Sequence, residues 1–324
     1  MTTSVAMCTY NGALFVREQL QSILSQNKPV DEIIICDDCS TDDTTNIIEC
    51  VQQETSIKIL LFKNNHQLGV NANFEQAIKR CSGDIIFLSD QDDIWEKNKV
   101  ETILGYFETH PNKNVVFGDA WLVDSNGDFI LRDGRKIRLW QVVGFSKKAQ
   151  KQFDKGFELE LWDRMNRATG ATMAFRRNFG QSISYSTNLG ILHDWLLAIK
   201  AFDNGHSLGY IIPPLILYRQ HSKNVIGCNI DLMYEQYMDD ARYPVQRCCT
   251  DYSYILHNTE YLQERVNFQT KRYGFIWSFG GYAVLKNIVY YFRYYGRYGI
   301  SFFAFDYKRS LYHSLERIKH KLHF

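Results

Sequence analysis

The amino-acid sequence predicts an α/β protein built on a mostly parallel sheet. Its first hundred residues contain apolar runs of strand length, such as "DEIIICDD" and "GDIIFL", that are continuous rather than alternating. Continuous apolar runs are typical of strands buried on both faces, and segments with a helical spacing of apolar residues separate them. Strands that alternate with helices in this way form parallel βαβ units.

The predicted elements follow one another in regular alternation. In chain order they are strand 4–10, helix 13–26, strand 31–38, helix 40–53, strand 57–62, helix 69–81 and strand 84–89. The first helix has apolar residues at Leu14, Leu20, Ile23 and Leu24, close to the helical period. We expect Ser40 to be the N-cap of the second helix, with Asp43 at the capping-box offset.

Residues 106–225 have a less regular pattern. "NVVFGDAWLVDSNGD" (114–128) predicts a hairpin with its turn at Asn126 and Gly127. "RATGATMAFRR" (167–177) predicts a small-residue turn that enters a strand or short helix, 192–202 predicts a helix, and 207–227 predicts one or two strands. From about residue 228 the pattern becomes helical.

The composition is that of a globular protein of one large or two ordinary domains. The 324 residues have a net charge of +1, which argues against a polyanionic partner for the chain as a whole. The opening residues lack a basic segment followed by a long apolar stretch, so we expect no signal peptide. The eight cysteines are scattered, so we expect a cytoplasmic chain with free thiols. Cys36 and Cys39 have CxxC spacing, but with no second pair we expect Cys36 to end a core strand.

Polar residues follow three of the predicted strands. Parallel sheets bind ligands at the carboxyl ends of their strands, so the residues at these ends are the candidate site. They are Thr9, Tyr10 and Asn11 after the first strand, Asp37 and Asp38 after the second, and Asp90, Asp92 and Asp93 after the fourth. The sequence therefore predicts a cluster of carboxylates at one edge of the sheet.

The stretch "FLSDQDDIW" (87–95) allows two interpretations. Carboxylates suit a solvated loop at a helix N-terminus. Alternatively, Asp90 and Asp92 bind Mg²⁺ or Mn²⁺, which commonly takes one or two carboxylates together with phosphate oxygens. The sequence contains neither a P-loop nor a G-x-G-x-x-G motif after a strand, so a nucleotide held by carboxylates and a metal fits better than one held in a glycine cradle.

Taken in order, these motifs resemble glycosyltransferase family 2, which has the GT-A fold. The resemblance begins with "AMCTYNGALFVREQLQSILSQ", "IIICDDCSTDDT" and "GVNANFEQAIKRCSGDIIFLSDQDDIW". It continues with "GATMAFRR", "HDW" and "LYRQHSKNVIG", which are similar to the rhamnosyltransferase-like branch, and it covers about residues 3–227. The resemblance implies a Rossmann-like, mostly parallel sheet flanked by helices and an inverting transfer of a sugar from a nucleotide-diphosphate donor.

The resemblance also implies a role for each matching residue. Thr9, Tyr10 and Asn11 would line the nucleoside pocket, and Asp38 would bind the base with Asp37 beside it. Asp90 and Asp92 would be the DxD pair, with Asp92 the direct metal ligand and Asp90 facing the ribose or the metal. Asp194 would be the catalytic base, which takes the proton of the acceptor hydroxyl.

Several of these residues also have a purely structural interpretation. Asp194 could lie at the exposed N-terminus of a helix, and His193 is expected to orient or pack rather than act as a second base. His221 could be a surface residue, a third metal ligand or a diphosphate contact. Trp95 and Trp195 could be core aromatics or line the sugar site. Gly170 and Ala171 could form a tight turn, or a bare backbone edge that the sugar approaches closely.

The end of the chain is basic and rich in aromatic residues. Residues 265–324 hold 11 Lys and Arg against 2 Asp and Glu, a local charge of +9. No nucleic-acid-binding module fits it, and we expect no nucleic-acid partner. It could be a packed helical cap, or interfacial helices that bind an anionic membrane surface. Its longest uncharged run, 273–285, is too short to span a membrane.

The sequence thus predicts a two-part protein that is peripheral to the inner face of the plasma membrane. Residues 1–227 would form the catalytic domain, with a nucleotide-sugar half at 1–105 and an acceptor half at 106–227, followed by the helical region 228–324. The expected reaction moves a sugar, first of all rhamnose, to a lipid-linked or polysaccharide acceptor. The alternatives are a UDP-hexose donor, a metal-dependent nucleotidyltransferase, and a degenerate binding module.

Overall fold

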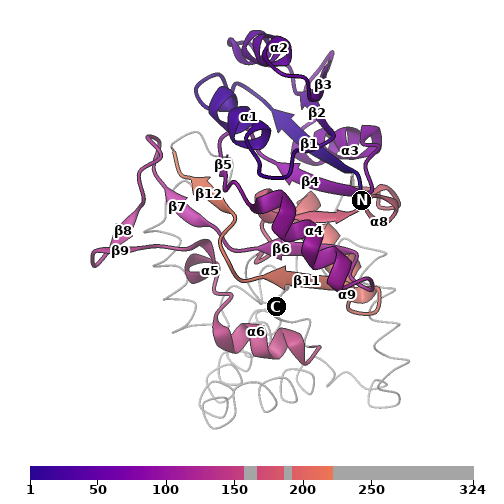
Figure 1. Ribbon diagram of the computed structural model, residues 1–324, viewed down its shortest axis with the longest axis vertical. Helices are drawn as coiled ribbons and strands as arrows, with labels where there is room; N and C mark the ends of the chain where they lie inside the picture. The colour runs from indigo at the N-terminus through magenta and orange to yellow at the C-terminus, as the bar shows by residue number, and fades with distance from the viewer. Residues whose placement is uncertain (157–165, 186–191, 222–324) are drawn as a thin grey trace, which may run out of the picture. The chain divides into compact units, whose positions relative to one another are not determined.

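The computed structural model describes residues 1–156, 166–185 and 192–221 (Figure 1). These residues belong to one compact unit, Met1–Arg242, and the second unit of the chain, Tyr243–Phe324, lies outside them. The predicted boundary near residue 227 and the basic helical region 228–324 also lie outside the described residues, so both stay predictions. None of the helices described is long and apolar enough to cross a membrane.

A seven-stranded sheet organises this unit. The strand order is β11-β6-β10-β4-β1-β2-β3. Their bounds are β1 Thr3–Thr9, β2 Glu32–Asp37, β3 Lys58–Lys63, β4 Ile85–Ser89, β6 Val115–Gly118, β10 Ala174–Arg176 and β11 Leu208–Ile211. All neighbours pair in parallel except β10, which is antiparallel to both β4 and β6. The predicted α/β fold with a mostly parallel sheet is confirmed.

Helices flank the sheet, as the alternating pattern predicts (Figure 1). The longer ones are α1 Val16–Leu24, α2 Thr44–Glu54, α3 Val70–Arg80, α4 Lys99–Thr109, α6 Lys147–Asp154 and α9 His193–Asp203. Helix α3 packs on β1 and β2, and α9 packs on β6 and β11. The shorter helical segments are α5 Leu139–Val142, the 3₁₀ turn η1 Gly170–Thr172 and α8 Arg177–Gln181.

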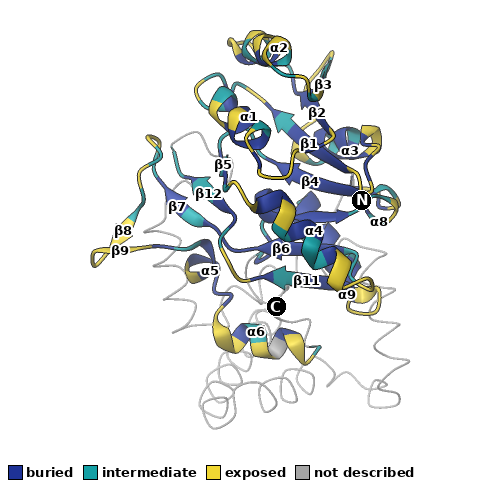
Figure 2. Cartoon of the chain, viewed as in Figure 1, coloured by how far each residue is buried: buried dark blue, intermediate teal, exposed yellow. Residues whose placement is uncertain are grey.

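The central strands form the core of the molecule, coloured dark blue in Figure 2. Residues 5–7 of β1, 33–35 of β2 and 85–88 of β4 are all fully buried. Each of these runs contains consecutive residues, whose side chains point to opposite faces of the sheet. Both faces are therefore covered, which is why the strands have no polar side in the sequence.

A second, three-stranded sheet has the order β5-β12-β7. Its strands are β5 Ile94–Trp95, β7 Trp121–Val123 and β12 Ile216–Arg219. Strand β12 is antiparallel to β5 and parallel to β7. This pairing brings the end of the described chain beside the "SDQDD" turn, although more than a hundred residues separate them. A two-stranded hairpin, β8 Leu131–Arg132 and β9 Arg135–Lys136, follows β7.

One local prediction is wrong and a second is confirmed. Helix α2 begins at Thr44 with Asp43 as N-cap, because the Ser40 hydroxyl instead hydrogen-bonds the Asp37 carboxylate at 2.5 Å. The hairpin predicted around Asn126 and Gly127 is present between β7 and residues 128–130, where the Asp124 N–H donates to the Asp128 carbonyl and the Ile130 N–H to the Leu122 carbonyl; β6, at the start of the predicted range, belongs to the large sheet instead. The turn itself is present: Gly127 has a φ of +86° and its N–H donates to the Asp124 carbonyl. It joins β7 to Phe129 through an isolated antiparallel bridge at Val123.

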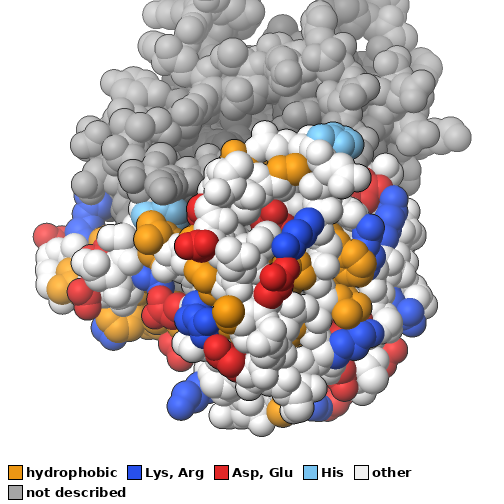
Figure 3. Space-filling view, turned by 90° about the horizontal axis from the view of Figure 1, so that it is seen from above, with side chains coloured by type: hydrophobic (Ala, Val, Ile, Leu, Met, Phe, Trp, Pro, Cys, Tyr) orange, Lys and Arg blue, Asp and Glu red, His pale blue; other side chains and the backbone are white. Residues whose placement is uncertain are grey.

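The surface of the described part carries both signs of charge. On the face in Figure 3, Lys and Arg side chains lie among Asp and Glu side chains. This mixture agrees with the small net charge of the whole chain. Broad electrostatic attraction to a polyanion is therefore not a property of this face.

Gly83 provides a test of the packing at the start of β4. A Cβ at Gly83 would lie 2.6 Å from the backbone carbon of Thr3 and 2.7 Å from the Ser4 nitrogen. We expect Gly83→Ala to lower the free energy of unfolding by about 1–3 kcal/mol, because the backbone of β1 must move. Denaturant titration should show this loss.

The matched control is Gly105→Ala in α4, where an added Cβ meets nothing within 4 Å. Alanine stabilises a helix interior relative to glycine, so this change should be neutral or raise stability by up to about 1 kcal/mol. Equal effects of the two substitutions would contradict the close contact at Gly83.

Candidate active site

The candidate residues meet at one edge of the large sheet because three adjacent strands run in parallel. Thr9 pairs with Asp37 in the β1–β2 register, and Met7 pairs with Ser89 in the β1–β4 register. The segments that follow β1, β2 and β4 therefore leave the sheet side by side. The predicted cluster of polar residues at this edge is present.

Asp37 organises the loops after β1 and β2. Its Oδ2 accepts hydrogen bonds from the hydroxyls of Thr9, at 2.8 Å, and Ser40, at 2.5 Å. Asn11 has a φ of +48°, and its side-chain oxygen accepts the N–H of Thr41 at 2.8 Å. The two loops are thus joined by side-chain contacts, and Tyr10 is 46% exposed.

Asp38 has a structural role in addition to its predicted contact with a base. Its carboxylate accepts the backbone N–H groups of Leu68, at 2.7 Å, and Gly69, at 2.9 Å, and the side-chain amide of Asn64. Gly69, with a φ of +79°, is the N-cap of α3. Asp38 therefore holds the loop between β3 and α3 against the end of β2.

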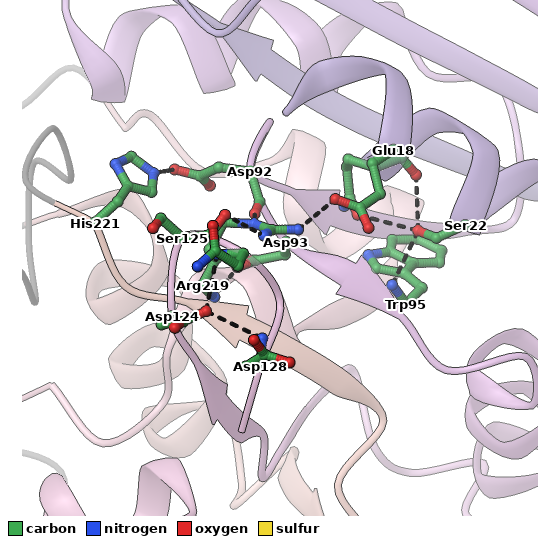
Figure 4. A network of polar contacts seen from close by, with 12 residues as sticks. Glu18, Ser22, Asp92, Asp93, Trp95, Asp124, Ser125, Asp128, Arg219 and His221 are labelled. Atoms are coloured by element: carbon green, nitrogen blue, oxygen red, sulfur yellow. Dashed lines mark hydrogen bonds and ion pairs between the residues drawn. The ribbon is translucent and has the colours of Figure 1, made fainter. Parts of the chain in front are cut away.

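The "SDQDD" turn divides its carboxylates between two tasks (Figure 4). Asp92 Oδ2 lies 2.9 Å from His221 Nε2, so the carboxylate and the imidazole converge. Asp93 is buried, and its Oδ1 accepts the backbone N–H of Arg219 at 3.0 Å. Asp92 is thus available to a ligand, whereas Asp93 fastens the turn to β12.

Arg219 is the main residue that sequence reasoning missed. Its side chain is 1% exposed and donates to three separate segments (Figure 4). Nε donates to the Asp92 carbonyl at 2.8 Å, Nη1 to the Ser125 carbonyl at 2.9 Å and Nη2 to Glu18 Oε2 at 2.5 Å. The guanidinium thereby fixes the backbone of Asp92. The sequence feature that could have indicated Arg219 is its position two residues before His221, in "YRQH".

Lys99 is a second missed residue. It is fully buried, its Nζ donates to the Ala171 carbonyl at 2.9 Å, and it lies 3.7 Å from the centre of the Trp95 ring. Burial lowers the pKa of Lys99 to about 7, and the charges of Asp93 and Asp90 oppose this shift. A buried cation beneath the turn offsets part of the carboxylate repulsion. Trp95 is itself buried, as a core aromatic.

Asp90 lies within the field of the other carboxylates. Burial, followed by the charges of Asp92 and Asp194, raises the pKa of Asp90 to about 7. The same three carboxylates, together with Asp93, contribute to raising the pKa of the Tyr218 phenol, after burial as the main cause. Asp194, far away in sequence, is therefore part of the same acidic cluster.

Asp194 is buried in the first turn of α9, so the alternative of an exposed helix end is wrong. Its Oδ2 accepts the N–H of Gly170 at 2.8 Å, and its Oδ1 accepts the N–H of Trp195 at 2.7 Å. Burial raises the pKa of Asp194 to about 6, although these N–H donors work against the shift. This is a pKa suited to a general base near neutral pH.

Gly170 and Ala171 form the 3₁₀ turn that supports Asp194. A Cβ at Gly170 would lie 3.3 Å from Asp194 Oδ2, so the glycine admits the carboxylate. In the described structure, the group that closely approaches the Gly170 backbone is thus the Asp194 side chain. Ala171 is buried, and its carbonyl accepts Lys99. Contact of this turn with a sugar stays a prediction.

His193 packs, as expected. Its ring stacks on Phe74 with centroids 4.0 Å apart, and among the described residues neither ring nitrogen has a hydrogen-bond partner. Burial lowers the pKa of His193 to about 3, so the imidazole is neutral. Trp195 is half-buried and packs against the core.

Asp92 and His221 fit a divalent cation whose remaining ligands come from a diphosphate. Within residues 1–156, 166–185 and 192–221 no group of three or more His, Cys, Asp or Glu side chains is arranged as a metal site. This holds for Cys36 and Cys39 too, and Cys36 is buried in β2. Two convergent protein ligands completed by phosphate and water are the usual arrangement for Mg²⁺ or Mn²⁺ on a nucleotide.

A Rossmann-like sheet with carboxylates at its strand ends, in place of a glycine-rich loop, defines the class of nucleotide-sugar transferases with the GT-A fold. The chain belongs to glycosyltransferase family 2: the model "Glycosyl transferase family 2" matches residues 4–180. It is therefore a glycosyltransferase that uses a nucleotide-sugar donor. Family membership decides against the nucleotidyltransferase alternative.

Individual relatives support the same assignment. The chain is 34% identical to the dTDP-rhamnosyl transferase RfbG of Shigella flexneri, over 69% of this chain and 74% of the relative. It is 35% identical to the Escherichia coli UDP-Glc:alpha-D-GlcNAc-diphosphoundecaprenol beta-1,3-glucosyltransferase WfaP, over 33% of this chain and 41% of the relative.

Among solved structures, S. aureus TarS 1-349 in complex with UDP-GlcNAc matches with a TM-score of 0.52. The sequence identity is 18%, and the match covers 69% of this chain and 60% of that chain. At this identity the likeness shows the fold alone, and it confirms the predicted GT-A fold.

Metal binding can be tested without a turnover assay. Asp92→Asn should weaken Mn²⁺ binding by about tenfold or more in the presence of UDP or TDP, because one anionic ligand is lost. Electron paramagnetic resonance of free Mn²⁺ measures the affinity. Asp133→Asn, at the exposed β8–β9 turn, is the control and should leave it unchanged. An unaltered affinity in Asp92→Asn would remove Asp92 from the metal site.

Proposed function

We propose that this protein is an inverting, metal-dependent glycosyltransferase of bacterial surface glycan synthesis. It transfers a sugar, first of all rhamnose, from a nucleotide-diphosphate donor to a hydroxyl of a lipid-linked or polysaccharide acceptor. The observation that carries the proposal is the buried Asp194, held by two N–H donors within the same acidic cluster as Asp90 and Asp92. Asp194 can thus act as the base, while Asp90 and Asp92 are suited to bind a cation.

The chemistry of the proposed step uses a single displacement. The acceptor oxygen attacks the anomeric carbon while Asp194 takes the hydroxyl proton, and the bond between that carbon and the diphosphate oxygen breaks. The electron pair of the broken bond leaves with the nucleoside diphosphate. No covalent enzyme intermediate is needed, and the configuration at the anomeric carbon inverts.

The leaving group requires stabilisation of its negative charge. Asp92 and His221, with Asp90 beside them, would hold a divalent cation, and a bound cation stabilises the charge that develops on the diphosphate. Arg219 supports this arrangement from behind, since its Nε holds the Asp92 carbonyl. His221 also packs on Phe15, with ring centroids 4.6 Å apart, which limits the directions its imidazole can take.

The nucleoside would bind at the ends of β1 and β2. Tyr10 offers an exposed ring for stacking, and Thr9 and Asn11 are held in place by the β2 loop. Asp37 would support the pocket from beneath, and Asp38 would bind the base through the acceptor capacity that its three existing hydrogen bonds leave.

The donor sugar is the least constrained part of the proposal. A dTDP-rhamnose donor is supported by the likeness to a dTDP-rhamnosyl transferase that extends over 69% of the chain. A UDP-hexose donor is the alternative, and the shorter match to a UDP-Glc-dependent glucosyltransferase supports it. A thermal-shift panel of dTDP-rhamnose, UDP-glucose and UDP-GlcNAc, with and without Mn²⁺, tests both. Stabilisation by none of them would contradict the proposed donor class.

Substitution of the base should separate chemistry from binding. Asp194→Asn should lower the turnover rate by about 10²–10⁴-fold while donor affinity persists, because only proton transfer is lost. In the unsubstituted protein the deprotonated carboxylate is active, so the rate should rise with pH, reach half its maximum near pH 6 and level off about one pH unit higher. Asp203→Asn, at the exposed end of the same helix, is the control. Normal turnover with weak donor binding in Asp194→Asn would assign Asp194 a different role.

We further propose that residues 265–324 hold the protein at the inner face of the plasma membrane, close to a lipid-linked acceptor. Each basic residue near an anionic surface is worth about 1 kcal/mol, and salt screens the attraction. Removal of residues after 265 should abolish flotation with anionic liposomes and leave nucleotide binding intact. If the shortened chain aggregates or loses the nucleotide, the region is a packed cap of the catalytic domain.

A further inference from the structure

Gln91, the middle residue of the Asp-x-Asp motif, makes an unusual pair of contacts. Its side-chain amide makes hydrogen bonds to both backbone polar groups of one distant residue. The N–H of Tyr10 donates to Gln91 Oε1 at 2.9 Å, and Gln91 Nε2 donates to the Tyr10 carbonyl at 3.0 Å. Two hydrogen bonds between an amide and one residue fix the orientation of the two groups as well as their distance.

Gly12 makes room for this pair. A Cβ at Gly12 would lie 2.1 Å from Gln91 Oε1 and 2.3 Å from Gln91 Cδ. The φ of Gly12 is not in the left-handed region, so its backbone accepts other residues. The space above Gly12, rather than its backbone conformation, is what the contact with Gln91 requires.

The two segments that Gln91 joins have different expected tasks. Tyr10 lies between Thr9 and Asn11, in the loop predicted to hold the nucleoside. Gln91 lies between Asp90 and Asp92, in the turn predicted to hold the cation. The remaining contacts of the first loop run to the opposite side, where Asn11 N–H bonds Ser40 Oγ and Gly12 N–H bonds Thr44 Oγ1, each at 2.8 Å.

We propose that Gln91 is a positioning residue that couples the nucleoside loop to the metal turn. Gln91 holds the loop at 9–11 at a fixed position relative to the turn at 90–92. A nucleoside diphosphate can then place its base in the loop and its phosphates on the cation at the same time. Cation binding then strengthens nucleotide binding through the protein as well as through the shared diphosphate. This inference rests on the proposed function, because it assigns the nucleoside to the loop at 9–11.

Two substitutions at different residues test the coupling. Gln91→Leu removes both hydrogen bonds, and Gly12→Ala displaces the Gln91 side chain without altering it. Gln52→Leu is the control, since Gln52 is a half-buried glutamine that donates to the Ile59 carbonyl at 3.0 Å, on α2. Calorimetry measures the Kd of UDP and of TDP in excess chelator and in saturating Mn²⁺. The ratio of the two values is the coupling.

Both test substitutions should reduce the coupling by about tenfold, the value of two ordinary hydrogen bonds lost from one geometry. Nucleotide affinity in chelator should change by less than about twofold, and the double variant should lose no more than either single one, because both changes break the same contact. Gln52→Leu should leave the coupling unchanged. If Gln91→Leu does not fold, Gly12→Ala decides alone.

Other outcomes overturn the inference. A lowered melting temperature with unchanged coupling would make Gln91 merely structural, and additive losses in the double variant would mean that Gly12 acts independently. The failure of the proposed function looks different, since the unsubstituted protein would then bind neither UDP nor TDP, with or without Mn²⁺.

Discussion

The repulsion between carboxylates at one edge of the sheet is the constraint on which the rest of the site depends. Asp90, Asp92 and Asp93 follow β4 within four residues, and Asp194 adds a fourth charge from α9. Burial makes such a cluster unfavourable unless cations or donors compensate it. The charge of buried Lys99 offsets part of the repulsion, and the backbone N–H of Arg219 donates to the Asp93 carboxylate.

The hydrogen bonds of the site also distinguish its carboxylates from one another. Asp93 is committed to the backbone of Arg219, whereas Asp92 converges on His221 from the other side of the turn. Asp194 is held by the N–H groups of Gly170 and Trp195, which keep its orientation but leave it the capacity to accept a proton. The proposed metal binding and proton transfer would thereby fall to separate carboxylates.

Much of the fold could be predicted because local pattern and tertiary environment agree. Continuous apolar strands occur only where both faces of a sheet are covered, so "EIIIC" and "IIFL" indicated β2 and β4 directly. The prediction failed where a polar side chain had a choice of partners. Serine is a residue type favoured at N-caps, but the Ser40 hydroxyl donates a hydrogen bond to the Asp37 carboxylate, and α2 begins four residues later. Which partner such a side chain takes depends on the distances between groups in the folded structure.

The sequence by itself determined the α/β class, the family and the candidate residues, because strand ends in a parallel sheet meet at one edge whatever the details of packing. Only the tertiary structure decided the working arrangement. It showed that His221 meets Asp92, that Arg219 holds the Asp92 carbonyl, that buried Lys99 donates to the Ala171 carbonyl, and that Gln91 holds Tyr10. These contacts join residues 72 to 129 positions apart. Their formation depends on the pairing of the second sheet and on side-chain directions, which no local pattern in the chain encodes.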